Sequence, residues 1–177
     1  PRPAGEGRGR RHRGGEDGAM SLHRYAETQR FPISVEEAWE FFSDPRNLAV
    51  ITPPDMGFEV TSDLPARMHP GMLVTYNVRP LAGIPVKWVT EITHCVEGVL
   101  FVDEQRFGPY RFWHHQHHFR AVPGGVEMRD IVHYDVGFGP IGDIVNLAVV
   151  RDRVAQIFEF RRRVLEQRFG VLPAHTY

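Results

Sequence analysis

The feature that most restricts the fold of this chain is a series of short strand-like segments followed by one long amphipathic helix. The helix is predicted over about residues 142–169, where apolar side chains recur at steps of three and four residues. Turns that contain glycine or proline separate the segments that precede it. The predicted strands span about residues 57–62, 72–79, 85–95, 99–107, 110–121 and 125–136.

The N-terminal part of this series adds one strand and two short helical segments. The strand is predicted over about residues 22–31. Ser34 to Glu37 then has the S-x-x-E pattern of a capping box, and a short helix follows that ends at Asp44-Pro45. Residues 46–52 are predicted to form a second helical turn, which Pro53-Pro54 stops.

These elements predict the α+β fold class, with a curved antiparallel sheet of about seven strands wrapped around the C-terminal helix. Two short helices follow the first strand. The terminal helix, about 40 Å long at ~1.5 Å per residue, is long enough to lie across such a sheet. A sheet that grips one helix commonly leaves a space between the two, and we expect the function to lie there.

Charge and cysteine content exclude several classes of protein. Lysine plus arginine total 21 and aspartate plus glutamate total 22, which gives a formal net charge of −1. This balance argues against a nucleic-acid or anionic-membrane binder, because such proteins carry a basic surplus. The longest apolar runs are only a few residues, so no membrane insertion is predicted. The single cysteine, Cys95, excludes an internal disulfide and fits the reducing cytoplasm.

A length of 177 residues indicates one domain, which is predicted over residues 20–172. Residues 1–19 are rich in glycine and arginine and contain almost no apolar side chains. Such a segment cannot bury enough surface to offset its ordering entropy, so we predict a disordered leader or extension. Residues 173–177 are predicted to form a short tail.

Four histidines fall within five residues, and strand alternation separates them onto two faces. Large aromatic residues bound one face, which we assign to the interior. This inner face carries Trp113, His115, His117 and Phe119. The outer face carries Phe112, His114, Gln116, His118 and Arg120.

The following strand places a carboxylate near these histidines. Asp130 and Tyr134 alternate with apolar residues and are predicted to point inward. If the Pro123-Gly124-Gly125 turn closes a tight hairpin, His117 faces Asp130. A two-residue shift in register would place Asp130 opposite another inward residue, such as His115. A buried aspartate is costly unless it is paired, and histidine is a natural partner.

Such a pair allows several functions. Asp130 could orient His117 as a general base, with Tyr134 as a donor. The same groups could bind the polar end of an apolar ligand, or they could form a structural hydrogen bond that fixes the register. Two inward histidines with one aspartate could also ligate zinc. No further ligand motif accompanies them, and neither a metal nor another cofactor is predicted.

The remaining polar residues are assigned to structural roles. The side chains of Asp103 and Gln105 are predicted to be solvated at a sheet edge. Arg161, Arg162 and Arg163 lie among glutamates and are predicted to form a solvated helix face. Cys95 has no visible orienting group and is interpreted as a small buried hydrophobic residue.

The spacing of these residues resembles that of a known superfamily. The matching residues are Gly108-Pro109-Tyr110, Trp113, His115, His117, Phe119, Gly124-Gly125, Asp130, Val132, Tyr134, Gly139-Pro140, Gly142, Ile157-Phe158 and Arg161. Over about residues 22–170 the chain resembles the START-like SRPBCC superfamily. Within it, the chain is similar to small bacterial proteins described as ligand-binding or cyclase/dehydrase-like.

The resemblance implies a helix-grip fold with a deep cavity under the terminal helix. It also implies non-covalent binding of lipids, polyketides, isoprenoids or similar apolar molecules. Some relatives are aromatase/cyclases or dehydratases, whereas others only carry or sense ligands, so the fold does not choose among these functions. No catalytic motif of the enzyme branches is recognisable, and His117 and Asp130 are catalytic candidates from alternation alone.

The sequence therefore predicts a cytoplasmic protein of bacterial type that binds a small hydrophobic molecule and no nucleic acid. One alternative is a cyclase or dehydratase that uses a His–Asp pair, and another is an interaction module with a filled core. The residues predicted to hold the body of the ligand are Trp39, Phe42, Trp88, Trp113, Phe119, Ile157 and Phe158. Those predicted to meet its polar end are His115, His117, Asp130 and Tyr134.

Overall fold

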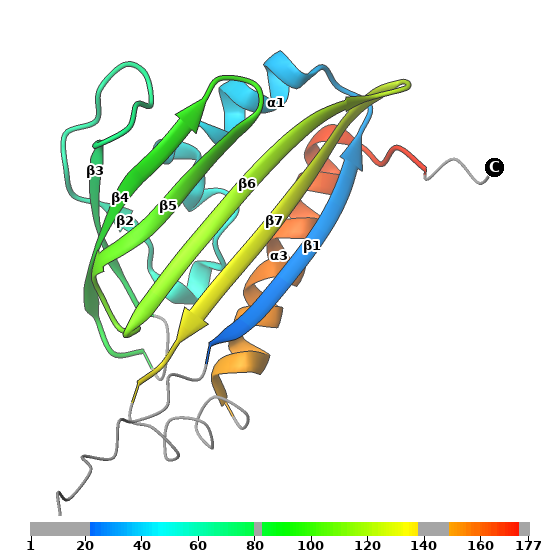
Figure 1. Cartoon of the computed structure of the whole chain (residues 1–177). Helices are drawn as coiled ribbons and strands as arrows, with labels where there is room; N and C mark the ends of the chain where they lie inside the picture. Colours follow the sequence, from blue (N-terminus) through cyan, green and yellow to red (C-terminus); the bar gives the residue numbers. More distant parts are fainter. Residues whose placement is uncertain (1–21, 80–82, 138–148, 174–177) are drawn as a thin grey trace, which may run out of the picture.

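The computed structural model describes residues 22–79, 83–137 and 149–173, and its main element is one antiparallel sheet (Figure 1). The sheet has seven strands in the order β1-β7-β6-β5-β4-β3-β2. Its strands are β1 (His23–Phe31), β2 (Glu59–Val60), β3 (Leu73–Val78), β4 (Val86–Val96), β5 (Leu100–Phe107), β6 (Phe112–Val122) and β7 (Gly125–Asp135). The first and last strands of the chain are therefore neighbours.

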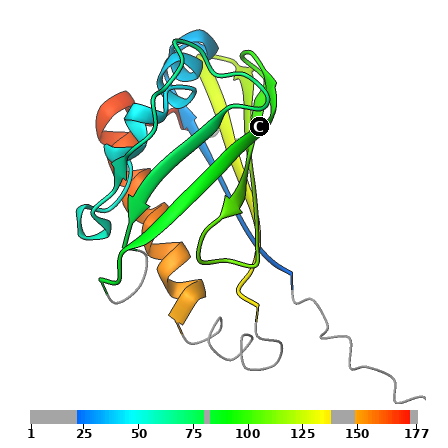
Figure 2. The ribbon, with the colours of Figure 1, turned by 90° about the vertical axis from the view of Figure 1, so that its left-hand side faces the viewer.

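The helices lie on one side of this sheet. Helix α3 (Arg151–Phe169) crosses the concave face, and Figure 2 shows the sheet curving around it. Helix α1 (Val35–Phe42) and the 3-10 helices η1 (Pro45–Ala49) and η2 (Pro54–Met56) connect β1 to β2. The predicted α+β class and helix-grip arrangement are confirmed.

Local signals explain where the short helices begin. The Ser34 hydroxyl accepts a hydrogen bond from the Glu37 backbone N–H at 3.1 Å and caps α1, as predicted. The predicted turn over 46–52 is shorter and forms η1. Pro53-Pro54 was predicted to stop this helical turn, and Pro54 is also the first residue of η2. Proline suits a first helical position, where its missing N–H has no partner to lose.

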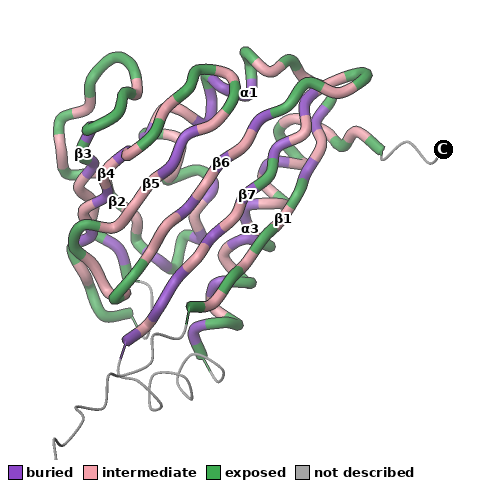
Figure 3. Tube along the Cα trace, in the orientation of Figure 1, coloured by how far each residue is buried: buried purple, intermediate pink, exposed green. Residues whose placement is uncertain are grey.

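The register of the β6–β7 hairpin is the one expected from its tight turn. Ala121 pairs with Val126, and His117 consequently pairs with Asp130. Figure 3 shows buried residues recurring along β6 and β7, which confirms the predicted inner face. Each inward imidazole is therefore held by a long strand in the middle of the sheet, so its position is well defined.

A closed apolar core lies between α1 and the strands beneath it. The Trp39 ring packs edge-on against the rings of Phe101 and Phe119, with centroids 5.9 and 5.6 Å apart. Leu165 of α3 and Phe31 of β1 are fully buried in the same cluster. This core fills part of the space between the helices and the sheet.

Several predictions fall on residues that the structure does not describe. They are the leader at residues 1–19, the start of the domain at Met20, most of the tail, and the helix before Val149. Among the described residues, no helix is both long enough and apolar enough to span a membrane.

Replacing Gly125 with alanine is expected to destabilise the protein by about 2 kcal/mol or more. A Cβ atom there would collide with the Phe31 carbonyl oxygen and lie 3.1 Å from Pro32 Cα, and backbone atoms cannot rotate away. Urea unfolding measures the loss. Gly71→Ala is the control, because its φ is +83° but nothing lies within 4 Å of the new Cβ, so only about 1 kcal/mol of backbone strain is expected. Equal losses in the two variants would contradict the argument.

Candidate functional site

A cavity of about 160 Å³ lies between the inner face of the sheet and helix α3. Its wall is formed mainly by apolar and aromatic side chains from α1, η1, the strands β3 to β6 and α3. The predicted ligand-contacting residues that line it are Phe42, Trp88, Trp113, His115, His117, Ile157 and Phe158. Their contact with a ligand stays a prediction.

Four other predicted residues lie outside the cavity wall. Trp39 and Phe119 belong to the closed core described above. Tyr134 is buried beside Tyr110, with ring centroids 5.9 Å apart. Asp130 is buried behind the two histidines and does not reach the cavity surface. Any effect of these four residues on a ligand would therefore act through their neighbours.

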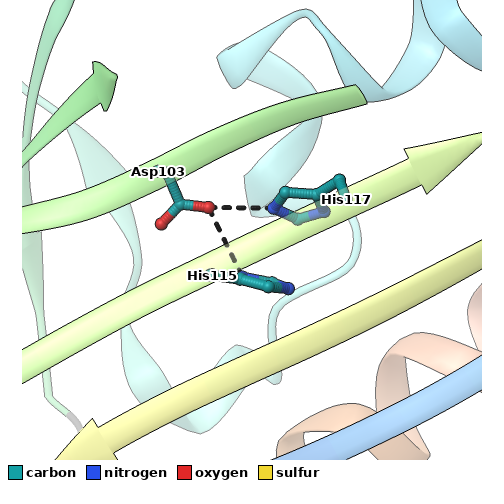
Figure 4. Close-up of side chains that lie close together, drawn as sticks. All are labelled: Asp103, His115 and His117. Atoms are coloured by element: carbon teal, nitrogen blue, oxygen red, sulfur yellow. Dashed lines mark hydrogen bonds and ion pairs between the residues drawn. The ribbon is translucent and has the colours of Figure 1, made fainter. Parts of the chain in front are cut away.

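The polar part of the cavity wall is a cluster of imidazoles and carboxylates. Figure 4 shows Asp103 of β5 beside His115 and His117 of β6. Asp103 Oδ2 lies 2.8 Å from His117 Nε2 and 3.4 Å from His115 Nδ1. The centroids of the two imidazole rings are 3.8 Å apart, and Phe101 stacks on His117 at 4.0 Å.

Asp130 closes the cluster from the other side. Its Oδ1 atom lies 2.8 Å from His117 Nδ1 and 3.0 Å from His115 Nε2. Each imidazole thus bridges the two carboxylates. The sequence left open which histidine pairs with Asp130, and in the structure both do. Arg161 of α3 adds a cation, with its Nη2 atom 3.4 Å from Asp130 Oδ1.

Mutual pairing sets the protonation of these groups. Burial alone would raise the pKa of Asp130, but Arg161 and both imidazoles outweigh it and hold that pKa well below its usual range. Burial also opposes ionisation of Asp103, yet the two histidines lower its pKa. The pKa of His115 is lowered by burial and then by the charge of His117. The pKa of His117 is raised despite burial, because it donates to both carboxylates.

Two residues of this cluster correct the sequence interpretation. Asp103 was predicted to be a solvated edge group, but β5 lies inside the sheet and the Asp103 side chain is only 17% exposed. Gln105 is also engaged, since its amide oxygen accepts a hydrogen bond from the Tyr110 backbone N–H at 3.3 Å. Alternation with the buried Phe101 was the available signal for Asp103.

Arg161 is the second correction, because it is buried and lines the cavity. Its guanidinium carbon lies 5.5 and 5.7 Å from the ring centroids of Phe42 and Phe158, within the range of cation–π attraction. Of the three consecutive arginines, Arg163 is exposed, as predicted. Cys95 is half-buried at the edge of the core, so it is less buried than expected.

The cluster also contains a possible set of metal ligands. Asp103, His115 and His117 each offer one donor atom, and these atoms all lie within 4.8 Å of one another. The sequence predicted no metal, because two inward histidines and Asp130 without a further ligand motif are weak evidence for a metal site, and Asp103 was assigned to solvent.

Comparisons with known proteins find similarity at the level of structure. No protein-family model matches the sequence, and no curated protein matches it. A START superfamily protein from Mycobacterium smegmatis matches with a TM-score of 0.61 and 14% identity, over 83% of this chain and 97% of that chain. Protein CV1439 from Chromobacterium violaceum matches with a TM-score of 0.64 and 12% identity, over 86% and 99%. Protein Ms6760 from Mycobacterium smegmatis matches with a TM-score of 0.58 and 21% identity, over 82% and 92%.

At these identities the likeness establishes the fold and leaves the function to be argued from the site. The curved antiparallel sheet, its strand order and the terminal helix in its concave face agree with the match to the START superfamily protein. The predicted helix-grip fold is thus confirmed, and this chain shares it with the START superfamily protein from Mycobacterium smegmatis.

Proposed function

We propose that this protein binds a small, largely apolar molecule in the cavity between the sheet and α3. The observation that carries the proposal is the cavity wall, which is mainly apolar and aromatic and contains one buried cluster of charged and imidazole side chains, Asp103, His115, His117 and Arg161. Ligand sites in proteins commonly combine an apolar wall with a few placed polar groups that orient the ligand. A module with a filled core is less consistent with a cavity of about 160 Å³.

Two buried donors in the wall indicate the chemistry of the ligand's polar end. Among the described residues, Trp88 Nε1 and Arg161 Nε have no hydrogen-bond partner. Both side chains line the cavity and are only 6% exposed. A buried donor without a partner costs about 1–3 kcal/mol, and an acceptor on a ligand would recover part of this. We therefore propose a ligand with oxygen acceptors on an apolar body, as in lipids, isoprenoids and polyketide-like molecules.

Native mass spectrometry of the freshly purified full chain tests this function. We expect a discrete extra mass that is lost in organic solvent, and its chemical analysis identifies the ligand class. The apo mass alone, together with no binding of a panel of fatty acids, isoprenoids and aromatic polyketides, would contradict the proposal.

Trp88→Phe is expected to weaken binding of the extracted ligand by about 5- to 10-fold, since it removes a hydrogen bond of about 1 kcal/mol and keeps an aromatic ring. Ligand occupancy by native mass spectrometry measures the change. Trp39→Phe is the matched control, because Trp39 lies in the closed core. Ligand occupancy in this variant is expected to change less than about twofold. Equal effects would mean that the Trp88 N–H does not contact the ligand.

The histidine pair supports a second candidate, a cyclase or dehydratase. Both imidazoles line the cavity, and carboxylates on either side fix their orientation, as in general acid–base sites. In a dehydration, one imidazole would take a proton from the carbon beside a carbonyl. The other would protonate the departing hydroxyl, so that water leaves and a double bond forms. Intact turnover of a β-hydroxy carbonyl substrate in both His117→Gln and Asp130→Asn would exclude this candidate.

A further inference from the structure

We propose that Asp103, His115 and His117 form a binding site for a divalent transition-metal ion that faces the cavity. The proposal goes beyond the binding of an apolar molecule and does not rest on it, because it concerns only these side chains and the residue behind them. The three side chains project from the adjacent central strands β5 and β6 toward one another (Figure 4).

The spacing of the donor atoms suits a metal ion. Asp103 Oδ2 is 2.8 Å from His117 Nε2 and 3.4 Å from His115 Nδ1. Zinc bonds to nitrogen and oxygen of about 2.0–2.1 Å in tetrahedral geometry require donor atoms about 3.3 Å apart. All three donor atoms lie within 4.8 Å of one another, so binding one ion requires side-chain rotations that bring these atoms to about 3.3 Å apart.

Asp130 supplies the outer support that metal-binding histidines commonly have. The ring nitrogens facing away from Asp103 are His115 Nε2 and His117 Nδ1, and both contact Asp130 Oδ1, at 3.0 and 2.8 Å. A carboxylate accepts hydrogen bonds, so it fixes the protons on these two nitrogens. The opposite nitrogens, His115 Nδ1 and His117 Nε2, face Asp103, and a metal ion that displaces the proton on His117 Nε2 would find both lone pairs directed toward it.

Counting protons around the cluster supports a cation at this point. Four imidazole nitrogens face carboxylate oxygens, and ionised carboxylates can only accept. A neutral His115 that donates from Nε2 to Asp130 leaves its Nδ1 lone pair facing Asp103 Oδ2 at 3.4 Å, and a second N–H there would place two imidazolium rings 3.8 Å apart beside Arg161. A metal ion between Asp103 and the two lone pairs satisfies the inner nitrogens without two adjacent imidazolium ions.

The donor set and its exposure indicate the kind of metal and site. Two imidazoles and one carboxylate suit Zn²⁺, Fe²⁺, Co²⁺ or Ni²⁺, whereas Mg²⁺ and Ca²⁺ prefer oxygen donors alone. Asp103, His115 and His117 all line the cavity, so a further coordination position would open into it. Three protein ligands with an open position are typical of catalytic rather than structural zinc sites. A water molecule or a ligand oxygen would occupy that position.

The experiment titrates the full chain, after removal of metals with a chelator, with Zn²⁺ or Co²⁺ alone. Isothermal calorimetry measures stoichiometry and affinity, and visible absorption reports Co²⁺ in a low-coordinate nitrogen and oxygen environment. We expect one tightly bound equivalent in the wild-type protein. Asp103→Asn and His115→Gln should each weaken it by roughly 100-fold or more, and Asp130→Asn by about 10- to 100-fold through loss of ring orientation.

His114→Gln and His118→Gln are the matched controls, because these histidines lie on the same strand but face outward. Their affinities are expected to stay within about twofold of wild type. No tight equivalent in the wild-type protein would overturn the proposal, whatever the folding of the variants. Equal weakening by the outward and inward variants would also overturn it, since the metal would then bind surface histidines. Ligand retention is measured separately by native mass spectrometry. A failure of the metal proposal can therefore be distinguished from a failure of the proposed ligand binding.

Discussion

Asp130→Leu is expected to reduce the free energy of unfolding by about 3–5 kcal/mol, a loss typical of breaking a buried ion pair. Asp130 Oδ1 is the common acceptor for His115, His117 and Arg161, and all four side chains are buried. Leucine would leave the Arg161 guanidinium buried without its carboxylate and would remove the acceptor that the two imidazoles share. Urea unfolding of the metal-free protein measures the effect.

Glu127→Leu is the matched control for this substitution on the same strand. Glu127 also pairs with two arginines, Arg30 at 2.7 Å and Arg120 at 2.6 Å, but these side chains are partly exposed to solvent. Solvated ion pairs contribute little, so the expected loss is about 1 kcal/mol or less. A loss in Glu127→Leu as large as that in Asp130→Leu would show that burial of the network is not the cause.

A double variant isolates the role of the buried cation. If an unpaired Arg161 accounts for much of the loss, Asp130→Leu combined with Arg161→Met should be less destabilised than the sum of the two single variants. The coupling energy expected for such neighbours is about 1–3 kcal/mol. Strict additivity would mean that Arg161 and Asp130 act independently despite a distance of 3.4 Å.

Strand alternation was enough to place the histidines of the site. The tight turn at Pro123-Gly124-Gly125 fixes the β6–β7 register, and a residue pattern with a period of two then leaves only one face for His115 and His117. Alternation could not show that both rings would contact Asp130, because that depends on side-chain rotation within the cluster.

Asp103 and Arg161 were predicted to be solvent-exposed because their side chains are charged. Their places in the strand and helix patterns were given less weight. The face of Asp103 could not be decided from the sequence because of a possible bulge near Gly108, and in the structure the pairing of β4 with β5 does shift register twice. Arg161, however, continues the buried helical series of Val154 and Phe158 and precedes Leu165, which is the spacing of one helix face. The helical periodicity therefore indicated that Arg161 is buried, whereas its charge wrongly suggested that it is exposed to solvent.

The boundary between core and cavity was the least predictable part of the site. Trp39 and Phe119 were expected to meet the ligand but pack edge-on with one another in a closed core. Tyr76, which was not singled out, lines the cavity and hydrogen-bonds to Thr90 at 2.8 Å. An apolar pattern identifies the inner face of a sheet, but only the curvature of the sheet and the position of α1 decide which part of that face remains open.

Ile157→Trp is expected to weaken ligand binding by about 100-fold, equivalent to about 2.7 kcal/mol, while the protein remains folded. Ile157 lines the cavity from α3, so a larger side chain at this position occupies the space proposed for the ligand. Because Ile157 is half-buried, the indole ring can extend into the open volume without displacing a fully buried neighbour. Binding of the fluorescent probe anilinonaphthalene sulfonate and retention of the extracted ligand measure the effect.

The matched control is Gln156→Trp, which adds the same side chain to the solvent-exposed face of the same helix. Its affinity is expected to stay within about twofold of wild type, because the cavity is unchanged. A thermal unfolding curve for each variant separates loss of the cavity from loss of the fold. Wild-type affinity in a folded Ile157→Trp protein would mean that the ligand binds elsewhere, since a ligand in this cavity would have to share its volume with the indole ring.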